Sequence, residues 1–477
     1  MTAAASAFHQ IKHIDWQSMD FTVRQLFPQS PARIFLVGIG GIGMSALAQY
    51  LRHCGYMVAG SDRALGNPAT EMLFRRLERQ GIRLFPQDGS GVAAFNPQAL
   101  VVSTAIEDGN PDLAAFEGPV FHRAAALSEM CRRQRPARLL AIAGSCGKTS
   151  VTSWIASTLK ALGVPMTMVG GGYAVEFRDE CHPGNFHSDA SPQFIVAEID
   201  ESDRTIDEFA PDYGLVLNIG DDHYGRLELA EEFNKFLSRC SVDALAPQEL
   251  RGCLRARRYY DDAPGGYCTT RDGIRFLLHG QEIACGQCGR YSAANGAAVF
   301  ELLRCVLPET QYADFRIAAA MGAFGGVCQR FQVVSTAASP MTVINDYAHN
   351  PEKIAAAISA AHERFREPLC VIFQPHGFRP LDFMRESLKA KLRETLRDDD
   401  LFLFLPVYYA GGTAQFSPTS EAVADEYASC GLPVKYLPGR ADVDRIIPAA
   451  PSSPRVILVL GARDPSLYDW SCALARS

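Results

Sequence analysis

One segment, residues 139–162, constrains the fold more than any other part of the sequence. Residues 139–143 are apolar and typical of a buried strand, whereas apolar residues recur at helical spacing over 151–162. Between them stands the glycine-rich turn Gly144-Ser-Cys-Gly147-Lys148-Thr149-Ser150. Such a turn binds phosphates, because backbone N–H groups and the helix N-terminus face the anion, the lysine reaches the terminal phosphates and the hydroxyl can bind Mg²⁺. The segment predicts a phosphate-binding α/β domain. The motif is shorter than usual, and a glycine-rich helix start with a solvated Lys148 is the alternative.

A second glycine-rich turn follows the first long apolar run of the chain. Residues 34–37 form the expected strand, 44–53 the expected helix, and Gly38-Ile-Gly40-Gly41-Ile-Gly43 lies between them. Asp62 follows the next expected strand, about twenty positions beyond the turn. In this G-x-G-x-x-G pattern the glycines let the backbone approach a pyrophosphate at a helix N-terminus. The pattern fits a dinucleotide, which would indicate an NAD(P)-dependent oxidoreductase, and it fits a UDP-linked substrate equally well.

Acidic residues follow the next apolar run after the phosphate turn. Residues 194–197 read as a strand that delivers Glu198-Ile-Asp-Glu-Ser-Asp203 at its carboxyl end. Carboxylates at a strand end near a phosphate loop are placed to bind a divalent cation. His223 follows another expected strand, 213–218, and is either a metal ligand or a capping residue.

The last third of the chain alternates strands and helices. Strands are expected at 341–344, 369–373, 401–405 and 456–460, and helices at about 351–365, 381–397 and 419–429. This alternation predicts a doubly wound parallel sheet whose site lies at the carboxyl ends of the strands. Three of those ends carry polar segments, 345–351, 374–379 and 461–463, which contain histidine or arginine.

Together these patterns predict an α/β protein of three domains. Residues 1–30 carry no motif and are left as an unassigned N-terminal extension. We expect a Rossmann-like domain over 31–136, a central P-loop domain of the ATPase type over 137–335 and a doubly wound domain over 336–477.

Composition excludes some classes of protein. The chain has 477 residues and a net charge of −7, which argues against a nucleic-acid binder that works through a basic surface. No apolar run approaches the length of a membrane span, and residues 1–31 lack the pattern of a signal peptide. The 14 cysteines are scattered, as expected for reduced thiols in a cytoplasm. Cys285 and Cys288, with Cys253 and Cys268 upstream, could form a zinc site, but unliganded thiols are the favoured interpretation.

The order of these motifs resembles the Mur ligases, ATP-dependent amide-forming enzymes of peptidoglycan precursor synthesis. The resemblance covers about residues 33–463 and is specific as a combination. The motifs that carry it are residues 35–45, 60–62, 102–106 with 110–111, 122–123, 144–149, 197–203, 218–223, 346–349 and 373–376.

The resemblance implies a reaction and a set of site residues. An amino acid, with L-alanine favoured, would be joined to the carboxylate of UDP-N-acetylmuramate through an acyl phosphate. The reaction would use ATP and Mg²⁺, and the enzyme would be a monomer or a homodimer. UDP-substrate binding falls to Gly38, Gly40, Gly41, Gly43, Asp62, Ser103, His122 and Arg123. ATP binding falls to Gly144, Gly147, Lys148, Thr149, Ser150, Asn295, Arg330 and Asp346, and metal binding to Thr149, Glu198 and His223. Lys148, Glu198 and His223 are the implied catalytic residues, and Tyr347, His349, His376 and Arg379 the implied amino-acid-binding residues.

The sequence departs from the family pattern at several of these motifs. Cys146 stands where the family has histidine, and the aspartate of a His-x-Asp motif is missing after His223. The histidine before Asn295 is absent, His349 is followed by Asn350 instead of a second histidine, and Gly377 replaces the arginine expected after His376. Two alternatives follow: ligation of a peptide or of another amine or carboxylate, and a non-catalytic nucleotide-binding regulator.

Overall fold

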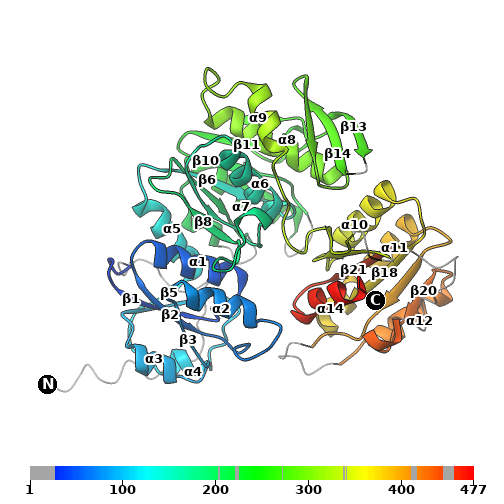
Figure 1. Ribbon diagram of the computed structural model, residues 1–477, viewed down its shortest axis with the longest axis horizontal. Coiled ribbons are helices and arrows are strands. Elements are labelled where there is room, and N and C mark those ends of the chain that lie inside the picture. Colours follow the sequence, from blue (N-terminus) through cyan, green and yellow to red (C-terminus); the bar gives the residue numbers. More distant parts are fainter. Residues whose placement is uncertain are drawn as a thin grey trace.

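The structure is a computed structural model that describes residues 27–201, 205–220, 225–270, 272–336, 339, 341–409, 416–443 and 456–476. Three α/β domains follow one another along the chain (Figure 1). The predicted fold class is confirmed, because each domain is built on a largely parallel sheet. No helix within the described ranges is long and apolar enough to cross a membrane.

The N-terminal domain is a parallel sheet of five strands in the order β3-β2-β1-β4-β5. Its strands are β1 Arg33–Val37, β2 Met57–Ser61, β3 Arg83–Phe85, β4 Ala99–Val102 and β5 Val120–His122. Its helices are α1 Ile42–His53, α2 Glu71–Arg79, α3 Ser90–Phe95, α4 Pro111–Ala114 and α5 Arg123–Arg133. The order of the strands reverses beside β1, so the glycine turn after β1 lies at the switch point where α/β sheets bind ligands.

The central domain has a sheet of seven strands in the order β12-β11-β10-β6-β9-β7-β8, in which only β8 is antiparallel to its neighbour. The strands are β6 Arg138–Ala143, β7 Met166–Val169, β8 Phe186–Ser188, β9 Phe194–Glu198, β10 Tyr213–Val216, β11 Asp243–Pro247 and β12 Arg258–Tyr260. The helices are α6 Lys148–Ala161, α7 Arg226–Ser238, α8 Arg290–Val306 and α9 Asp314–Met321. Three further strands, β13 Gly265–Thr270, β14 Gly273–Leu278 and β15 Gln281–Cys285, form a separate antiparallel sheet.

The C-terminal domain has six strands in the order β16-β17-β21-β18-β19-β20. They are β16 Gln332–Val333, β17 Thr342–Asp346, β18 Leu369–Gln374, β19 Leu401–Phe404, β20 Val434–Tyr436 and β21 Val456–Gly461. Its helices are α10 Pro351–Arg364, α11 Phe378–Thr395, α12 Ser420–Ser429 and α14 Ser466–Leu474. The antiparallel strand β16 begins this sheet, ahead of the boundary at 336 expected from sequence. Asp346 pairs with Leu460, and Gln374 with Gly461, so the ends of β17, β21 and β18 lie side by side.

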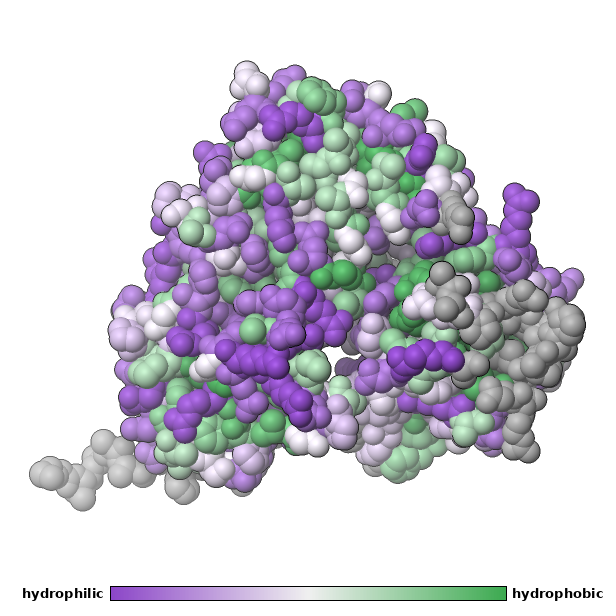
Figure 2. Space-filling view, viewed as in Figure 1, coloured by the Kyte–Doolittle hydropathy of each residue, from purple (hydrophilic) through white to green (hydrophobic). Residues whose placement is uncertain are grey.

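The N-terminal and central domains share one hydrophobic core. A single cluster of buried apolar side chains runs from α1 and the first sheet into the central sheet and α7, and includes Leu47, Tyr50, Ile195 and Phe233. The C-terminal domain packs around two further clusters, one of which also includes Cys288 of the central domain. Figure 2 shows an opening between the body formed by the first two domains and the C-terminal domain, with many hydrophilic residues around it.

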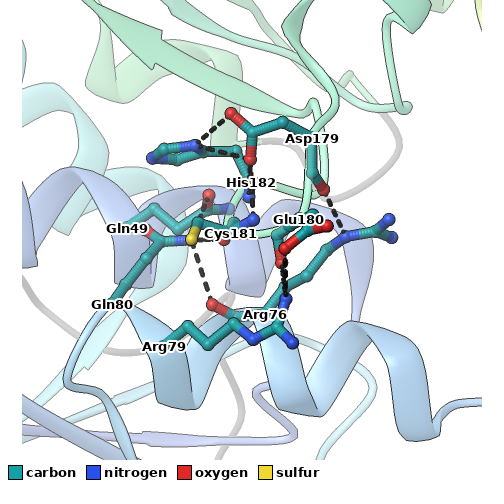
Figure 3. Close-up of polar contacts among 8 residues, drawn as sticks. All are labelled: Gln49, Arg76, Arg79, Gln80, Asp179, Glu180, Cys181 and His182. Atoms are coloured by element: carbon teal, nitrogen blue, oxygen red, sulfur yellow. Dashed lines mark hydrogen bonds and ion pairs between the residues drawn. The ribbon is translucent and has the colours of Figure 1, made fainter.

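Polar contacts reinforce the junction of the first two domains at its rim. Three side chains at the end of α2 point toward the loop 179–182 of the central domain (Figure 3). Arg76 Nε donates to the carbonyl of Asp179 at 2.8 Å, Arg79 Nη1 to that of Glu180 at 2.7 Å, and Gln80 Nε2 to that of Cys181 at 2.8 Å. All three side chains donate to backbone carbonyls, so these contacts depend on the main-chain conformation of the loop.

Candidate active site

The phosphate turn follows β6, the buried central strand of its sheet. Gly144 and Gly147 have φ values of +130° and +88°, which only glycine adopts without strain. A Cβ on Gly147 would also lie 2.6 Å from Oδ1 of Asn295, because α8 brings Asn295 against the turn. The structure therefore brings together the predicted ATP-binding residues of two distant segments. Helix α6 begins at Lys148, three residues before the start expected from apolar spacing.

Lys148 is held at the centre of the turn by a carboxylate. Its Nζ donates to the carbonyl of Gly144 at 2.6 Å and to both oxygens of Glu201 at 2.9 and 2.8 Å. Burial by itself lowers the pKa of Lys148, but the carboxylates of Glu201, Asp200 and Glu198 outweigh burial and raise that pKa above its usual value. Lys148 is therefore charged at neutral pH. Sequence analysis did not assign Glu201 a role, although it lies in the acidic segment that the β9 strand delivers.

Two oxygen-bearing side chains face each other beside the turn. Thr149 Oγ1 donates to Oε1 of Glu198 at 3.1 Å, and Oε2 of Glu198 accepts from the amide of Gly171 at 2.7 Å. A hydroxyl and a carboxylate are ligands that suit Mg²⁺, so these two predicted metal ligands fit the ion chemically. His223, the third predicted metal ligand, lies outside the described residues. Within the described ranges, no group of three or more His, Cys, Asp or Glu side chains could hold a metal ion.

The cysteines for which a zinc site was the less favoured interpretation lie in different surroundings. Cys285 and Cys288 are buried, and Arg364 Nη1 donates to Sγ of Cys288 at 3.0 Å. Burial raises the pKa of both thiols. Cys268 is exposed and Cys253 is partly buried, where its Sγ contacts the carbonyl of Leu250 at 3.4 Å.

The N-terminal glycine turn is braced by its own acidic residue. Asp62 accepts from the amide of Gly40 at 2.7 Å and from that of Ala64 at 2.8 Å. His122 caps α5 by accepting from the amide of Ala124 at 3.2 Å. Next to it, Arg123 lies over Gly43 and reaches Oδ2 of Asp200 in the central domain at 3.7 Å. Arg123 thus links the glycine turn to the acidic strand end.

One cavity of about 340 Å³ lies between the N-terminal glycine turn and the ends of β7 and β9 in the central domain. Its N-terminal wall is formed by Gly41, Ile42, Gly43, Met44, Ser103, Thr104, Arg123 and Leu127. Its central wall is formed by Val169, Gly170, Gly171, Glu198 and Asp200. The cavity therefore places the predicted UDP-substrate residues Gly41, Gly43, Ser103 and Arg123 opposite Glu198, a predicted metal ligand. Arg123 contributes a positive charge to the lining, and Glu198 and Asp200 contribute carboxylates. A substrate anchored on the first turn would present its far end to Glu198, which accepts a hydrogen bond from Thr149 of the phosphate turn.

The predicted residues of the C-terminal domain gather at strand ends but do not line this cavity. Asp346 accepts from the amides of Phe331 and Ala348 at 2.6 and 2.7 Å. Burial raises the pKa of Asp346, and the positive charge of Arg330 opposes that effect. The guanidinium carbon of Arg330 lies 5.2 Å from the ring centroid of Tyr347. Asp346, Arg330 and Tyr347 thus form one group where the central domain passes into the C-terminal sheet.

Two histidines lie edge to face beside this group. The ring centroids of His349 and His376 are 5.2 Å apart, and Nδ1 of His349 lies 2.9 Å from the carbonyl of Tyr347. Burial lowers the pKa of His349 to about 3 and that of His376 to about 4, with a further contribution from Arg463 to His376. Both rings are neutral at pH 7. Arg379 is exposed, and Arg463, which sequence analysis left without a role, is exposed at the end of β21 with φ +70°.

Three family models match the chain in the order of its domains. The model described as the Mur ligase family catalytic domain matches residues 33–135, the Mur ligase middle domain matches 142–239, and the Mur ligase glutamate ligase domain matches 329–463.

Individual proteins are similar over almost the whole length. The UDP-N-acetylmuramate–L-alanine ligase of Acidithiobacillus ferrooxidans is 33% identical over 470 residues, which cover 90% of this chain and 95% of the relative. The solved UDP-N-acetylmuramate-alanine ligase of Thermotoga maritima has a TM-score of 0.74 at 24% identity and covers 93% of this chain and 98% of its own. The murein peptide ligase of Psychrobacter arcticus has a TM-score of 0.61 at 16% identity, with 93% and 98% covered. From its three matched domains and its identity to a full-length relative, the chain belongs to the Mur ligase family.

Proposed function

We propose that this protein is an ATP-dependent ligase that joins an amino acid, L-alanine in first place, to the carboxylate of UDP-N-acetylmuramate in peptidoglycan precursor synthesis. The observation that carries the proposal is the single cavity shared by the N-terminal glycine turn and Glu198. A UDP-sugar held at Gly41 and Gly43 would direct its carboxylate toward the phosphate turn. The 33% identity to an L-alanine ligase supports this choice of substrates.

The described side chains can perform the parts of such a reaction that fall to the protein. The substrate carboxylate attacks the γ-phosphate of ATP, which gives an acyl phosphate, and the amine then displaces phosphate. Phosphoryl transfer needs positioning and charge stabilisation more than a protein nucleophile. Lys148, charged and fixed by Glu201, is placed to stabilise the transferring phosphoryl group. Thr149 and Glu198 would hold Mg²⁺, which supplies charge neutralisation for the phosphates.

The amine would come from the side of the C-terminal domain. Neutral His349 and His376, with Tyr347, follow strand ends, and Arg379 lies at the start of α11; these residues do not line the cavity. An acyl phosphate must be protected from water, so we propose that the C-terminal domain closes over the cavity during the reaction. We place the reaction in the cytoplasm, where the 14 free cysteines stay reduced.

A second candidate amine is a short peptide. Gly377, with φ +152°, has no side chain at the position where the family resemblance leads us to expect arginine. Less side-chain volume and one cation fewer beside His376 leave room for an amine longer than alanine. A peptide ligase and an alanine ligase share the first half of the reaction and differ in the second.

The test is phosphate release from ATP and Mg²⁺ with UDP-N-acetylmuramate across a panel of single amino acids and short peptides. Release that requires both the UDP-sugar and one amine would establish the ligase and name its substrate. Binding of ATP without release under any amine would favour a regulator instead. The Lys148→Ala variant should lose turnover while binding the UDP-sugar nearly as well as the wild type, because the lysine acts on transferring charge. Lys160→Ala, an exposed lysine at the far end of α6, is the matched control.

A further inference from the structure

We propose that Asn185 is a positioning residue that sets the distance between the UDP-substrate turn and the phosphate turn. Asn185 precedes β8 in the central domain, and its side chain is fully buried at the junction with the N-terminal domain. The inference rests on the proposed function, because it concerns how two bound substrates of that reaction meet.

The side chain of Asn185 binds the first turns of α1, the helix that follows the N-terminal glycine turn. Its Nδ2 donates to the carbonyl of Ile42 at 2.8 Å and to Oγ of Ser45 at 2.9 Å. Its Oδ1 accepts from Nε2 of Gln49 at 2.8 Å. Ser45 and Gln49 are also buried, so this is a set of polar contacts away from solvent, in which each lost partner is costly.

The backbone of the same residue binds the other wall of the cavity. The carbonyl of Asn185 accepts from the amide of Gly170 at 2.9 Å. The next amide, that of Gly171, binds Glu198, and Glu198 binds Thr149 at the start of α6. A continuous path of hydrogen bonds therefore crosses the domain junction from α1 to the phosphate turn through Asn185.

The residues along this path border the space where the substrates would meet. Ile42, Gly170, Gly171 and Glu198 all line the cavity of about 340 Å³. A shift of α1 against the Gly170–Gly171 segment would move the UDP-substrate relative to the transferring phosphate. A misplacement of 1 Å between reacting groups can cost about 10²-fold in rate. Asn185 is well placed to prevent such a shift because it binds both segments.

The contacts of α2 in Figure 3 provide a control within the same junction. Arg79 binds the carbonyl of Glu180 at 2.7 Å, but neither residue lines the cavity. Arg79→Ala therefore weakens the junction without altering the path through Asn185.

The experiment compares Asn185→Ala, Gln49→Met and Arg79→Ala by steady-state phosphate release, calorimetric binding of the UDP-sugar and of ATP, and hydrogen–deuterium exchange. For Asn185→Ala we expect kcat to fall about 10²-fold, with both binding constants within about threefold of the wild type. Exchange should rise at Gly170, Gly171 and the first turns of α1. Gln49→Met removes the bonds that Nε2 of Gln49 donates to Asn185 and to the carbonyl of Ser45, and the bond that its Oε1 accepts from Gln80. It should lower kcat about tenfold and should add little to the loss in the double variant with Asn185→Ala. Arg79→Ala should keep kcat within about twofold.

The proposal is overturned if Asn185→Ala and Gln49→Met keep wild-type kcat. It is also overturned if Arg79→Ala lowers kcat as much as Asn185→Ala does. Loss of UDP-sugar binding in proportion to kcat would also overturn it, because Asn185 would then support the binding turn alone. If Asn185→Ala does not fold, Gln49→Met decides by the same criteria. A wild-type protein that releases no phosphate with any amine would count against the proposed function, whereas unchanged exchange at Gly170 in the Asn185 variant would count against the coupling.

Discussion

Replacing Glu201 by glutamine should destabilise the protein without nucleotide and much less with it. Glu201 is the charged partner of Lys148, and only 8% of its side chain is exposed. Glutamine has nearly the same shape but no charge, so Glu201→Gln leaves a buried ammonium with the carbonyl of Gly144 and one amide oxygen. Removing one partner of a buried ion pair is costly because the remaining charge stays desolvated.

The size of the effect follows from the geometry of the pair. At the N–O distance of 2.8 Å, two unit charges attract by about 6 kcal/mol at an effective dielectric constant of about 20. Burial of the carboxylate opposes this attraction and raises the pKa of Glu201, although Lys148 lowers it. We therefore expect a loss of about 3 kcal/mol in the free energy of unfolding, at the lower end of the range for such deletions. In a domain of this size that corresponds to a decrease of about 6–12 °C in Tm.

Differential scanning calorimetry with and without a non-hydrolysable ATP analogue and Mg²⁺ tests the reasoning. Phosphate oxygens should take the place of the lost carboxylate beside Lys148, so the difference in Tm should fall below about 3 °C at saturating nucleotide. Glu231→Gln, which alters an exposed carboxylate of α7, is the control and should change Tm by less than about 2 °C. A Glu201→Gln variant as stable as the wild type without nucleotide would refute the argument, as would a difference that nucleotide does not reduce.

Three further changes test other parts of the site. Gly171→Ala would place a Cβ 2.4 Å from Oε1 of Glu198, so kcat for phosphate release should fall on the order of 10²-fold while UDP-sugar binding persists, and a normal kcat would contradict this placement of Glu198. Asp346→Ala should raise the KM for ATP about tenfold with a smaller effect on kcat, and an unchanged KM would remove Asp346 from the nucleotide site. His349 has a folded-state pKa of about 3, below its usual 6.5, so its contribution to stability is fully present above pH 6.5 and is lost as pH falls toward 3. Urea unfolding at pH 7 and pH 5 should therefore show a pH effect smaller by about 2 kcal/mol in His349→Gln than in the wild type, and an equal effect in both proteins would show that this ring does not titrate as stated.

The parallel sheets were predictable from sequence because their strands are buried on both faces. Continuous apolar runs such as 139–143 and 456–460 mark such strands, and the structure has β6 and β21 at those places. The glycine turns were equally visible, because a turn between a strand and a helix needs backbone conformations that glycine supplies. The three-stranded antiparallel sheet was not among the elements expected from sequence. Its strands β13–β15 have a mixed burial pattern that gives a weaker signal.

The partners of the site residues were not predictable because they come from distant segments. Lys148 and Glu201 are 53 positions apart, and Asn185 is 143 positions from Ile42. The strand end at 198 indicated that carboxylates would lie near the phosphate turn, but not which of them would bind the lysine. Asn185 lies in a stretch with no periodicity, and its importance depends on how two domains pack.

Because the first two domains share a core, the units that fold together do not coincide with the three domains of the chain. Family models divide the chain into three parts, and each part has its own sheet. The apolar cluster that contains Tyr50 and Phe233 makes the first two parts a single cooperative unit, whereas the C-terminal domain buries its own side chains. A cut near residue 136 would expose half of the shared core on each fragment, whereas a cut before β16 would separate only Cys288 and Phe331 from the two C-terminal clusters. Natural recombination or protein engineering can therefore exchange the C-terminal domain of this chain more easily than its N-terminal domain.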